Sequence, residues 1–320
     1  MRPDPELLSD AQPQDYHLHY ALEHAPFGIE SDTSLFVLSA GHEEALDKLY
    51  RALLARKSFL LITGAPGTGK TLLLQTLMEL AAEHCDFLTI FPEDLDPLDK
   101  SADRLSALAL RAAQKNEMKA DKLVNRALVP DAQAGVNVKN ALLRDYIAKA
   151  QSERRHPTFV IDEAQRLSDA ALETLRCWSN LDSPGGRAVQ FILAGQKSLG
   201  ARLNAPELLS VKQRIGMRCE LPALSLTDTK RYISHRCQLA GATRTLFEQS
   251  IIIRIYSLSR GYPRMINSIA DALLLQAYLR GNRTVTVADV ASVSRDLDLS
   301  YAPIIRRPRA GQIASRKLDS

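Results

Sequence analysis

Eight consecutive residues, from Gly64 to Thr71, match the pattern Gly-x-x-x-x-Gly-Lys-Thr, which wraps the phosphates of a nucleotide. Glycine at three of these positions permits backbone conformations that a Cβ would obstruct, so that successive N–H groups can point at one anion. The Lys70 ammonium would reach the β- and γ-phosphates, and the Thr71 hydroxyl would complete a Mg²⁺ shell. We therefore expect a phosphate site formed by Gly64, Ala65, Pro66, Gly67, Thr68, Gly69, Lys70 and Thr71.

Two adjacent acids, Asp162 and Glu163, follow the apolar run 158–161. A carboxylate at the tip of a strand beside a phosphate loop can hold Mg²⁺, so Asp162 joins Thr71 as an expected metal ligand. Glu163 can polarise a water for attack on the γ-phosphate. The alternative is an exposed acidic pair that begins a helix, where acids suit the helix dipole. The complete phosphate loop upstream favours the catalytic interpretation.

The elements that must position these residues alternate along the first two thirds of the chain. Short apolar runs typical of buried strands alternate with segments of helical pattern, which predicts an α/β fold with a parallel sheet covered on both faces. The expected strands are 59–63, 87–91, 158–161 and 190–194, and the expected helices are 39–54, 71–82, 100–128 and 168–180. The order strand, glycine loop, helix places the phosphates at a positive helix N-terminus.

Beyond Pro222 the pattern changes to helical segments with no clear strand between them, at about 227–240, 245–259, 263–280 and 287–297. We expect a small helical domain there. The domain organisation predicted from these changes is an extended leader over 1–30, a nucleotide-binding domain over 31–222, a helical domain over 223–300, and a disordered basic tail over 301–320.

Composition places the protein in an ordinary soluble class. Of its 320 residues 45% are hydrophobic and 24% charged, and no stretch approaches the roughly 18 apolar residues of a membrane span. The N-terminus lacks the pattern of a secretory signal, so we expect a cytoplasmic protein. Four scattered cysteines predict reduced thiols rather than a disulfide frame or a zinc site.

Basic and acidic residues are equal in number over residues 1–300, and the excess of basic residues lies at the end of the chain. Residues 301–320 carry a net charge of +4, which equals the net charge of the whole chain. Residues 1–300 therefore give no bulk electrostatic attraction to nucleic acid. A local basic patch on this part of the protein is still compatible with the balanced charge. The tail could touch DNA phosphates or an acidic partner, and a short basic terminus is most often only a solubilising end.

The order of these features resembles an AAA+ ATPase, and more narrowly the ExeA/GspA-like bacterial ATPases. The resemblance spans roughly residues 27–297, and the stretches that carry it are 27–29, 35–39, 42–46, 161–165, 193–196, 213–215 and 261–267. It implies the P-loop AAA+ fold followed by a helical lid, with ATP and Mg²⁺ as cofactors.

The resemblance also implies roles for single residues. Gln196, at the end of the fourth strand, would be the polar sensor that orients the attacking water. Arg264, at the start of a lid helix, would reach the γ-phosphate as a second sensor. The segment from Phe36 to His42 would lie against the adenine. For Arg264 the alternative is a solvated residue in the first turn of a helix.

A further implied role concerns assembly. Arg214 would be the finger offered to the ATP of a neighbouring subunit, with Arg218 as the second choice, and an ion pair with local acids is the alternative for Arg214. A finger that acts in trans requires a ring or filament, so we expect a homo-oligomer with ATP between subunits.

Three functions compete. The first is an ATP-hydrolysing assembly switch for a bacterial secretion or envelope machine. The second is a related AAA+ regulator of DNA transposition, which forms ATP-dependent oligomers on duplex DNA and recruits a transposase; the basic tail and the stop at Ser320 favour it, because secretion-type members continue into a membrane segment and a wall-binding domain. The third is a scaffold that binds ATP and barely hydrolyses it, which the intact Glu163 opposes. The stop at Ser320 leads us to expect a stand-alone ATPase module.

Overall fold

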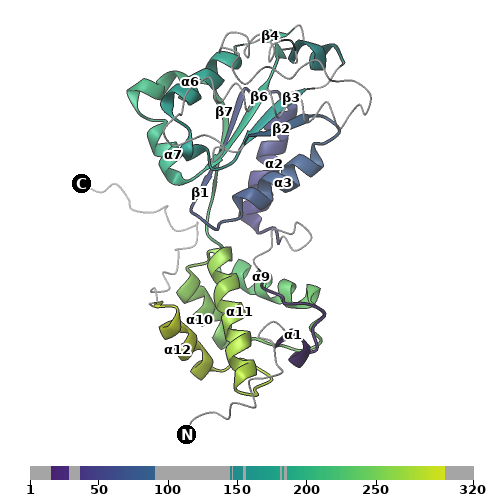
Figure 1. The fold of residues 1–320 in the computed structure, drawn as a ribbon, viewed down its shortest axis with the longest axis vertical. Coiled ribbons are helices and arrows are strands. Elements are labelled where there is room, and N and C mark those ends of the chain that lie inside the picture. Colours follow the sequence, from purple (N-terminus) through teal and green to yellow (C-terminus); the bar gives the residue numbers. More distant parts are fainter. Residues whose placement is uncertain are drawn as a thin grey trace, which may run out of the picture. The chain divides into compact units, whose positions relative to one another are not determined.

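The structure is a computed structural model that describes residues 16–28, 37–90, 145, 147–153, 156–180, 182–183 and 186–299. The chain divides into two compact units, one formed by residues 30–224 and the other by residues 1–29 together with 225–320. The helical pattern at 100–128 and the basic tail at 301–320 lie outside the described residues. Figure 1 labels the elements of both units.

Unit 30–224 contains the predicted parallel sheet, which confirms the α/β fold. Five strands pair in the order β2-β3-β6-β1-β7, and all of their pairings are parallel. Their bounds are β1 Phe59–Gly64, β2 Asp86–Ile90, β3 Pro157–Ile161, β6 Gln190–Gly195 and β7 Ile215–Leu221. Because β1 lies between β6 and β7, the glycine loop that follows it leaves from the interior of the sheet.

The three central strands of the sheet, β3, β6 and β1, form the core. Every residue of β3 and β6 is buried, and one face of the sheet stacks the rings of Phe59, Phe159 and Phe191, with Phe191 4.8 Å from Phe59 and 5.5 Å from Phe159 between ring centroids. Burial on both faces explains why these strands are continuous apolar runs.

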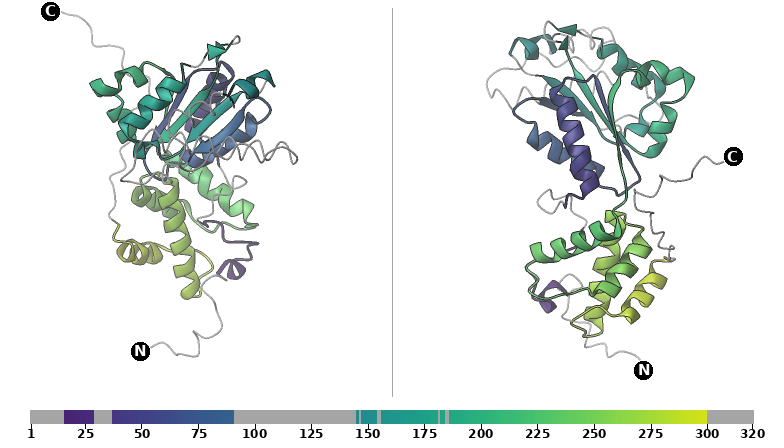
Figure 2. Two further views of the ribbon diagram at one scale, coloured as in Figure 1. Left: turned by 45° about the horizontal axis from the view of Figure 1, so that its top comes forward. Right: turned by 180° about the vertical axis from the view of Figure 1, so that it is seen from behind.

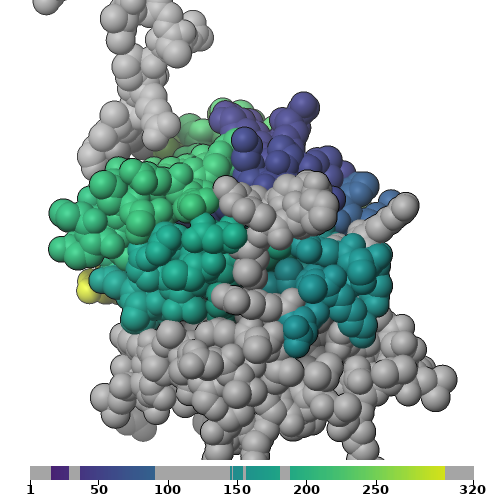
Figure 3. Space-filling model, turned by 90° about the horizontal axis from the view of Figure 1, so that it is seen from above, coloured from purple at the N-terminus to yellow at the C-terminus, as the bar shows by residue number. Residues whose placement is uncertain are grey.

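Helices cover both faces of this sheet, as Figure 2 shows from two sides. The phenylalanine face packs against apolar side chains from α6, α7 and α8, and the other face packs against α2 and α3. Their bounds are α2 Ala40–Leu54, α3 Lys70–Leu80, α6 Asp169–Trp178, α7 Lys197–Arg202 and α8 Leu209–Lys212. Smaller elements of this unit are the 3₁₀ turns η5 (Ala164–Arg166) and η6 (Pro206–Leu208) and the short ribbon of β4 (Asp182–Ser183) and β5 (Gly186–Arg187). In the space-filling view, α2 reaches the surface in purple (Figure 3).

Strand β7 is the one strand of the sheet that the sequence did not predict. It pairs with β1 alone, and exposed residues such as Arg218 and Glu220 alternate with the buried Cys219 and Leu221. An edge strand with one solvated face shows no continuous apolar run, and of its first two residues Ile215 is partly buried and Gly216 is exposed.

The other unit is helical, as the pattern after Pro222 predicted. Its elements are α1 Tyr16–His19, α9 Leu226–Leu239, α10 Gln249–Ser259, α11 Pro263–Leu279 and α12 Val287–Asp296. Capping boxes begin α9 at Ser225 and α12 at Thr286, where the third helical residue is an aspartate in each case. No described helix is both long enough and apolar enough to cross a membrane.

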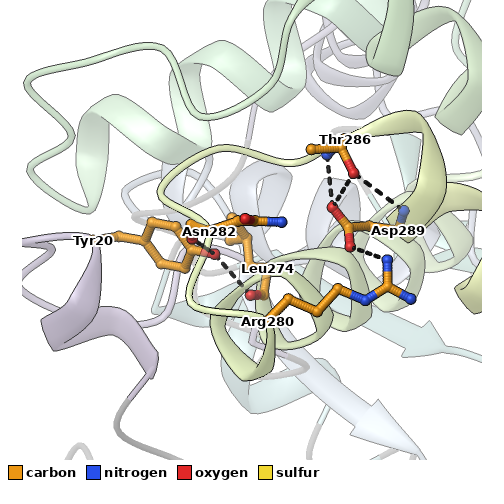
Figure 4. A network of polar contacts seen from close by, with 6 residues as sticks. All are labelled: Tyr20, Leu274, Arg280, Asn282, Thr286 and Asp289. Atoms are coloured by element: carbon orange, nitrogen blue, oxygen red, sulfur yellow. Dashed lines mark hydrogen bonds and ion pairs between the residues drawn. The ribbon is translucent and has the colours of Figure 1, made fainter.

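Residues 16–28 differ from the extended leader that we expected. They begin with the helix α1 and pack into the helical unit, where Tyr16, Tyr20 and Phe27 are each less than 5% exposed. The Tyr20 hydroxyl donates to the Leu274 carbonyl at 2.9 Å. Figure 4 shows this contact beside the ion pair of Arg280 with the buried Asp289. Three aromatic side chains therefore anchor a segment whose proline and histidine content suggested an open chain.

Candidate functional site

The candidate site lies at the carboxyl edge of the parallel sheet. Thr63 of β1 is in register with Gly195 of β6, and Ile161 of β3 is in register with Leu193. The segments that follow these three strands are the glycine loop, the acids at 162–163 and Gln196. The register therefore brings them to one edge, as expected for neighbouring parallel strands.

The glycine loop adopts the conformations that its sequence requires. Gly67 and Gly69 have φ values of +74° and +91°, which disfavour any residue with a Cβ. A Cβ on Gly64 would lie 2.7 Å from Thr68 Oγ1 and 3.1 Å from the Leu221 carbonyl oxygen, so this position also excludes a side chain. The loop runs into the first residue of α3, and the first turn of that helix can offer free N–H groups to an anion.

Lys70 is folded back onto this loop. Its side chain is 6% exposed, and Nζ donates to the carbonyl oxygens of Gly64 and Ala65 at 3.2 and 3.0 Å. Burial lowers the pKa of the ammonium, while the nearby charges of Glu163 and Asp162 act in the opposite direction. Within the described part of the chain, the hydrogen-bond acceptors of this cation are two neutral carbonyl groups, which fits a site where phosphate oxygens supply the stronger partner.

Thr71 and Asp162 meet across the site. The Thr71 hydroxyl donates to one carboxylate oxygen of Asp162 at 2.6 Å, and the other accepts from the backbone N–H of Glu163 at 2.8 Å. A hydroxyl and a carboxylate oxygen at this separation are hard donors of the kind that Mg²⁺ prefers. The residues present therefore fit the ion, and Thr71 and Asp162 would hold it.

The Glu163 carboxylate has a partner that the sequence analysis did not identify. Glu163 has a left-handed backbone, with φ of +51°, and one of its oxygens accepts from the Gln165 side-chain amide at 2.5 Å. The carbonyl oxygen of the same Gln165 amide accepts from the backbone N–H of Gln196 at 3.0 Å. In the sequence, the one sign of this contact is that Gln165 follows Glu163 by two residues. No sequence pattern indicates that Gln165 also contacts Gln196, which lies 31 residues further along the chain.

The His42 side chain lies against the backbone of the glycine loop. His42 is 2% exposed, and its Nε2–H donates to the Thr68 carbonyl oxygen at 2.8 Å. Nδ1 lies 2.7 Å from the Ser39 hydroxyl. Both ring nitrogens therefore contact protein, and the ring supports the backbone of the phosphate loop. Phe36, the other end of the expected adenine segment, lies outside the described residues.

Gln196 and the two candidate arginines differ in their placement. Gln196 directly follows β6 at the site edge and is the N-cap of α7. Arg214 directly precedes β7, whose first residue Ile215 is in register with Phe59 at the start of β1. Arg214 is therefore at the opposite edge of the sheet, roughly 20 Å from the glycine loop at about 3.3 Å per strand residue. Arg264 is the exposed second residue of α11 in the helical unit.

Comparison with known proteins gives two sequence relationships. Residues 53–203 match the family described as AAA domain. General secretion pathway protein A from Aeromonas hydrophila is 30% identical over 276 residues, which cover 86% of this chain and 47% of that protein. The chain thus spans about half the length of this relative. The AAA domain match includes the glycine loop, Asp162, Glu163 and Gln196.

Solved structures share the fold at low sequence identity. Cdc6p from Pyrobaculum aerophilum superposes with a TM-score of 0.62 and 17% identity, over 83% of this chain and 71% of that one. The ORC2 protein of Aeropyrum pernix gives a TM-score of 0.58 at 18% identity, over 81% and 68%. The RuvB Holliday junction branch migration motor of Thermotoga maritima gives 0.52 at 18% identity, over 80% and 70%. These similarities concern the fold alone.

Proposed function

Because this chain is an AAA+ protein of the ExeA/GspA-like family, we propose that it binds ATP with Mg²⁺ and hydrolyses it at the carboxyl edge of its sheet. The observation that carries the proposal is the contact of Thr71 with Asp162, beside Glu163. This contact joins the phosphate loop to the acidic strand end. Phosphoryl transfer needs both parts at one place, because positioning and charge stabilisation supply nearly all of the catalysis.

Each residue of the candidate site has a defined task in the proposed reaction. The loop N–H groups and Lys70 bind the β- and γ-phosphates, and Thr71 and Asp162 would hold the ion. When bound, Mg²⁺ would neutralise phosphate charge. Glu163 accepts a proton from the attacking water as the water oxygen bonds to the γ-phosphorus and the bond to the bridging oxygen breaks, which yields ADP and phosphate. Gln196 would orient that water, and Arg264 stays the proposed second sensor of the γ-phosphate.

Two variants test the chemistry. Lys70→Ala should abolish nucleotide binding, measured by titration with a fluorescent ATP analogue. Glu163→Gln should keep the affinity for ATP while turnover falls about 10²-fold or more, because a general base contributes factors of that order. Full hydrolysis by Glu163→Gln would overturn the assignment of the base, and a wild-type protein without Mg²⁺-dependent hydrolysis would overturn the proposed activity.

The same proposal extends to the process served. The name of the Aeromonas relative assigns that protein to general secretion, and its sequence covers most of this chain. We propose that this chain also serves secretion, as an ATP-controlled assembly switch for a secretion or envelope machine. Co-purification with envelope components that depends on ATP should be retained by Glu163→Gln and lost by Lys70→Ala. ATP-dependent binding to duplex DNA that weakens with salt would instead support the transposition function.

A further inference from the structure

Gln165 occupies a position between the two parts of the site that must act together. Its amide nitrogen donates to the Glu163 carboxylate at 2.5 Å, and its amide oxygen accepts from the Gln196 backbone N–H at 3.0 Å. Both polar ends of one side chain are thereby used. The side chain connects the end of β3 to the end of β6.

The structure leaves space for this bridge at a specific place. A Cβ added to Gly195, the last residue of β6, would lie 2.8 Å from Gln165 Oε1 and 2.9 Å from Leu199 Cδ2. Real Cβ atoms do not approach other atoms so closely, so a side chain at 195 would displace the glutamine amide. The glycine at the end of β6 therefore permits the contact.

The backbone of the turn that carries Gln165 is held by hydrogen bonds from Arg202. Arg202, the last residue of α7, donates to the carbonyl oxygens of Gln165 at 3.0 Å and of Leu167 at 2.6 Å. Its third contact is an ion pair with Asp169 at 2.8 Å. The turn that carries Gln165 is thus attached to α7, the helix that begins directly after Gln196. A shift of α7 would move both ends of the bridge.

We propose that Gln165 is a positioning residue that holds the Glu163 carboxylate and couples its orientation to the end of β6 at Gln196. The inference rests on the proposed ATPase function and deepens it. Glu163 itself has a left-handed backbone, and no second side chain among the described residues donates a hydrogen bond to its carboxylate. Without the Gln165 amide, the carboxylate could rotate away from the attacking water. Reacting groups misplaced by about 1 Å can lose on the order of 10²-fold in rate.

The test compares two substitutions that differ in which end of the bridge they keep. Gln165→Met removes both hydrogen bonds at nearly the same volume. Gln165→Glu keeps an acceptor for the Gln196 N–H and loses the donor to Glu163. We expect kcat to fall about tenfold or more in both variants, with KM for ATP and the Kd for a non-hydrolysable ATP analogue within about threefold of wild type. Gln238→Ala, an exposed glutamine on α9, is the control and should match wild type.

The outcomes separate a positioning role from a purely structural one. If Gln165 only ties the turn to Gln196, Gln165→Glu restores wild-type kcat, and the proposal is overturned. It is also overturned if both variants keep more than half of wild-type kcat, or if the analogue Kd rises in parallel with the loss of rate. Thermal unfolding of each variant verifies that the compared proteins are folded. Wild-type protein without ATPase activity would instead refute the proposed function itself, so the two failures are distinguishable.

Discussion

At the scale of single residues, the site depends on contacts between positions far apart in the chain. Thr71 and Asp162 are 91 residues apart in sequence, and their oxygens lie 2.6 Å apart. Their types and their place after two strands were sufficient to predict this meeting, because parallel strands end at a common edge. The bridge by Gln165 and the burial of His42 were not predictable in this way. Each depends on a side-chain conformation that packing selects and that no spacing in the sequence encodes.

The buried contact of His42 with the Thr68 carbonyl leads to a prediction about nucleotide selectivity. Loss of a buried hydrogen bond costs about 1–3 kcal/mol, so His42→Ala should weaken nucleotide binding roughly tenfold. Because the ring supports the loop backbone, ATP and GTP should lose affinity by the same factor. Isothermal titration of both nucleotides measures this, with the exposed His235→Ala as control. A loss confined to ATP would show that His42 reads the adenine, as the resemblance implied.

The buried His156 leads to a prediction about how the free energy of unfolding depends on pH. His156 is 6% exposed, and burial followed by the positive charge of Arg56 lowers its pKa from 6.5 to about 4. The folded protein therefore holds this ring neutral, while the unfolded chain protonates it below pH 6.5. Stability should fall by about 2–4 kcal/mol as the pH drops from 6.5 to 4. Urea unfolding at a series of pH values should show this slope, and His156→Gln should flatten it; an equal slope in both proteins would contradict the prediction.

At the scale of elements, apolar pattern predicted the strands buried on both faces and most of the helices. It failed where an element has one solvated face or is short, as in β7 and α1. Strand β7 alternates exposed and buried residues at the edge of the sheet, and α1 is four residues long. In α1 the stabilising contacts are tertiary. The aromatic side chains of residues 16–28 pack in the helical unit, which local helical propensity does not report.

This dependence on tertiary contacts can be measured at Tyr20. Tyr20→Phe removes only the hydroxyl contacts with the carbonyl oxygens of Leu274 and Asn282 and should cost about 1 kcal/mol, whereas Tyr20→Ala also leaves a cavity and should cost about 3–5 kcal/mol. Because the chain has two units, hydrogen exchange of separate peptides is the suitable measurement. Protection should fall in α11 and stay unchanged in β1. Unchanged exchange in α11 of Tyr20→Ala would show that residues 16–28 do not stabilise the helical unit.

At the scale of the whole molecule, the position of Arg214 decides which ATP it can serve. It precedes β7 at the amino edge of the sheet, whereas the glycine loop follows β1 at the carboxyl edge. The separation of roughly 20 Å along the strand exceeds the reach of an arginine side chain. Among the described residues it has no hydrogen-bond or ion-pair partner for its side chain, so the alternative of a local ion pair has no support there. If Arg214 acts on ATP, that ATP belongs to another subunit.

Mixing two inactive variants tests this directly. Arg214→Ala subunits keep an intact Glu163 and offer no finger, while Glu163→Gln subunits offer Arg214 and cannot hydrolyse. Each alone should show little turnover, because loss of such a finger costs about 10³–10⁵-fold in kcat. A mixture should recover hydrolysis in proportion to the mixed interfaces, since Glu163→Gln supplies Arg214 to the competent site of its neighbour. The double variant Glu163→Gln/Arg214→Ala, mixed in place of Glu163→Gln, should give no recovery. Recovery with Arg218→Ala subunits but not with Arg214→Ala subunits would move the finger to Arg218, and no recovery with either would refute a shared site.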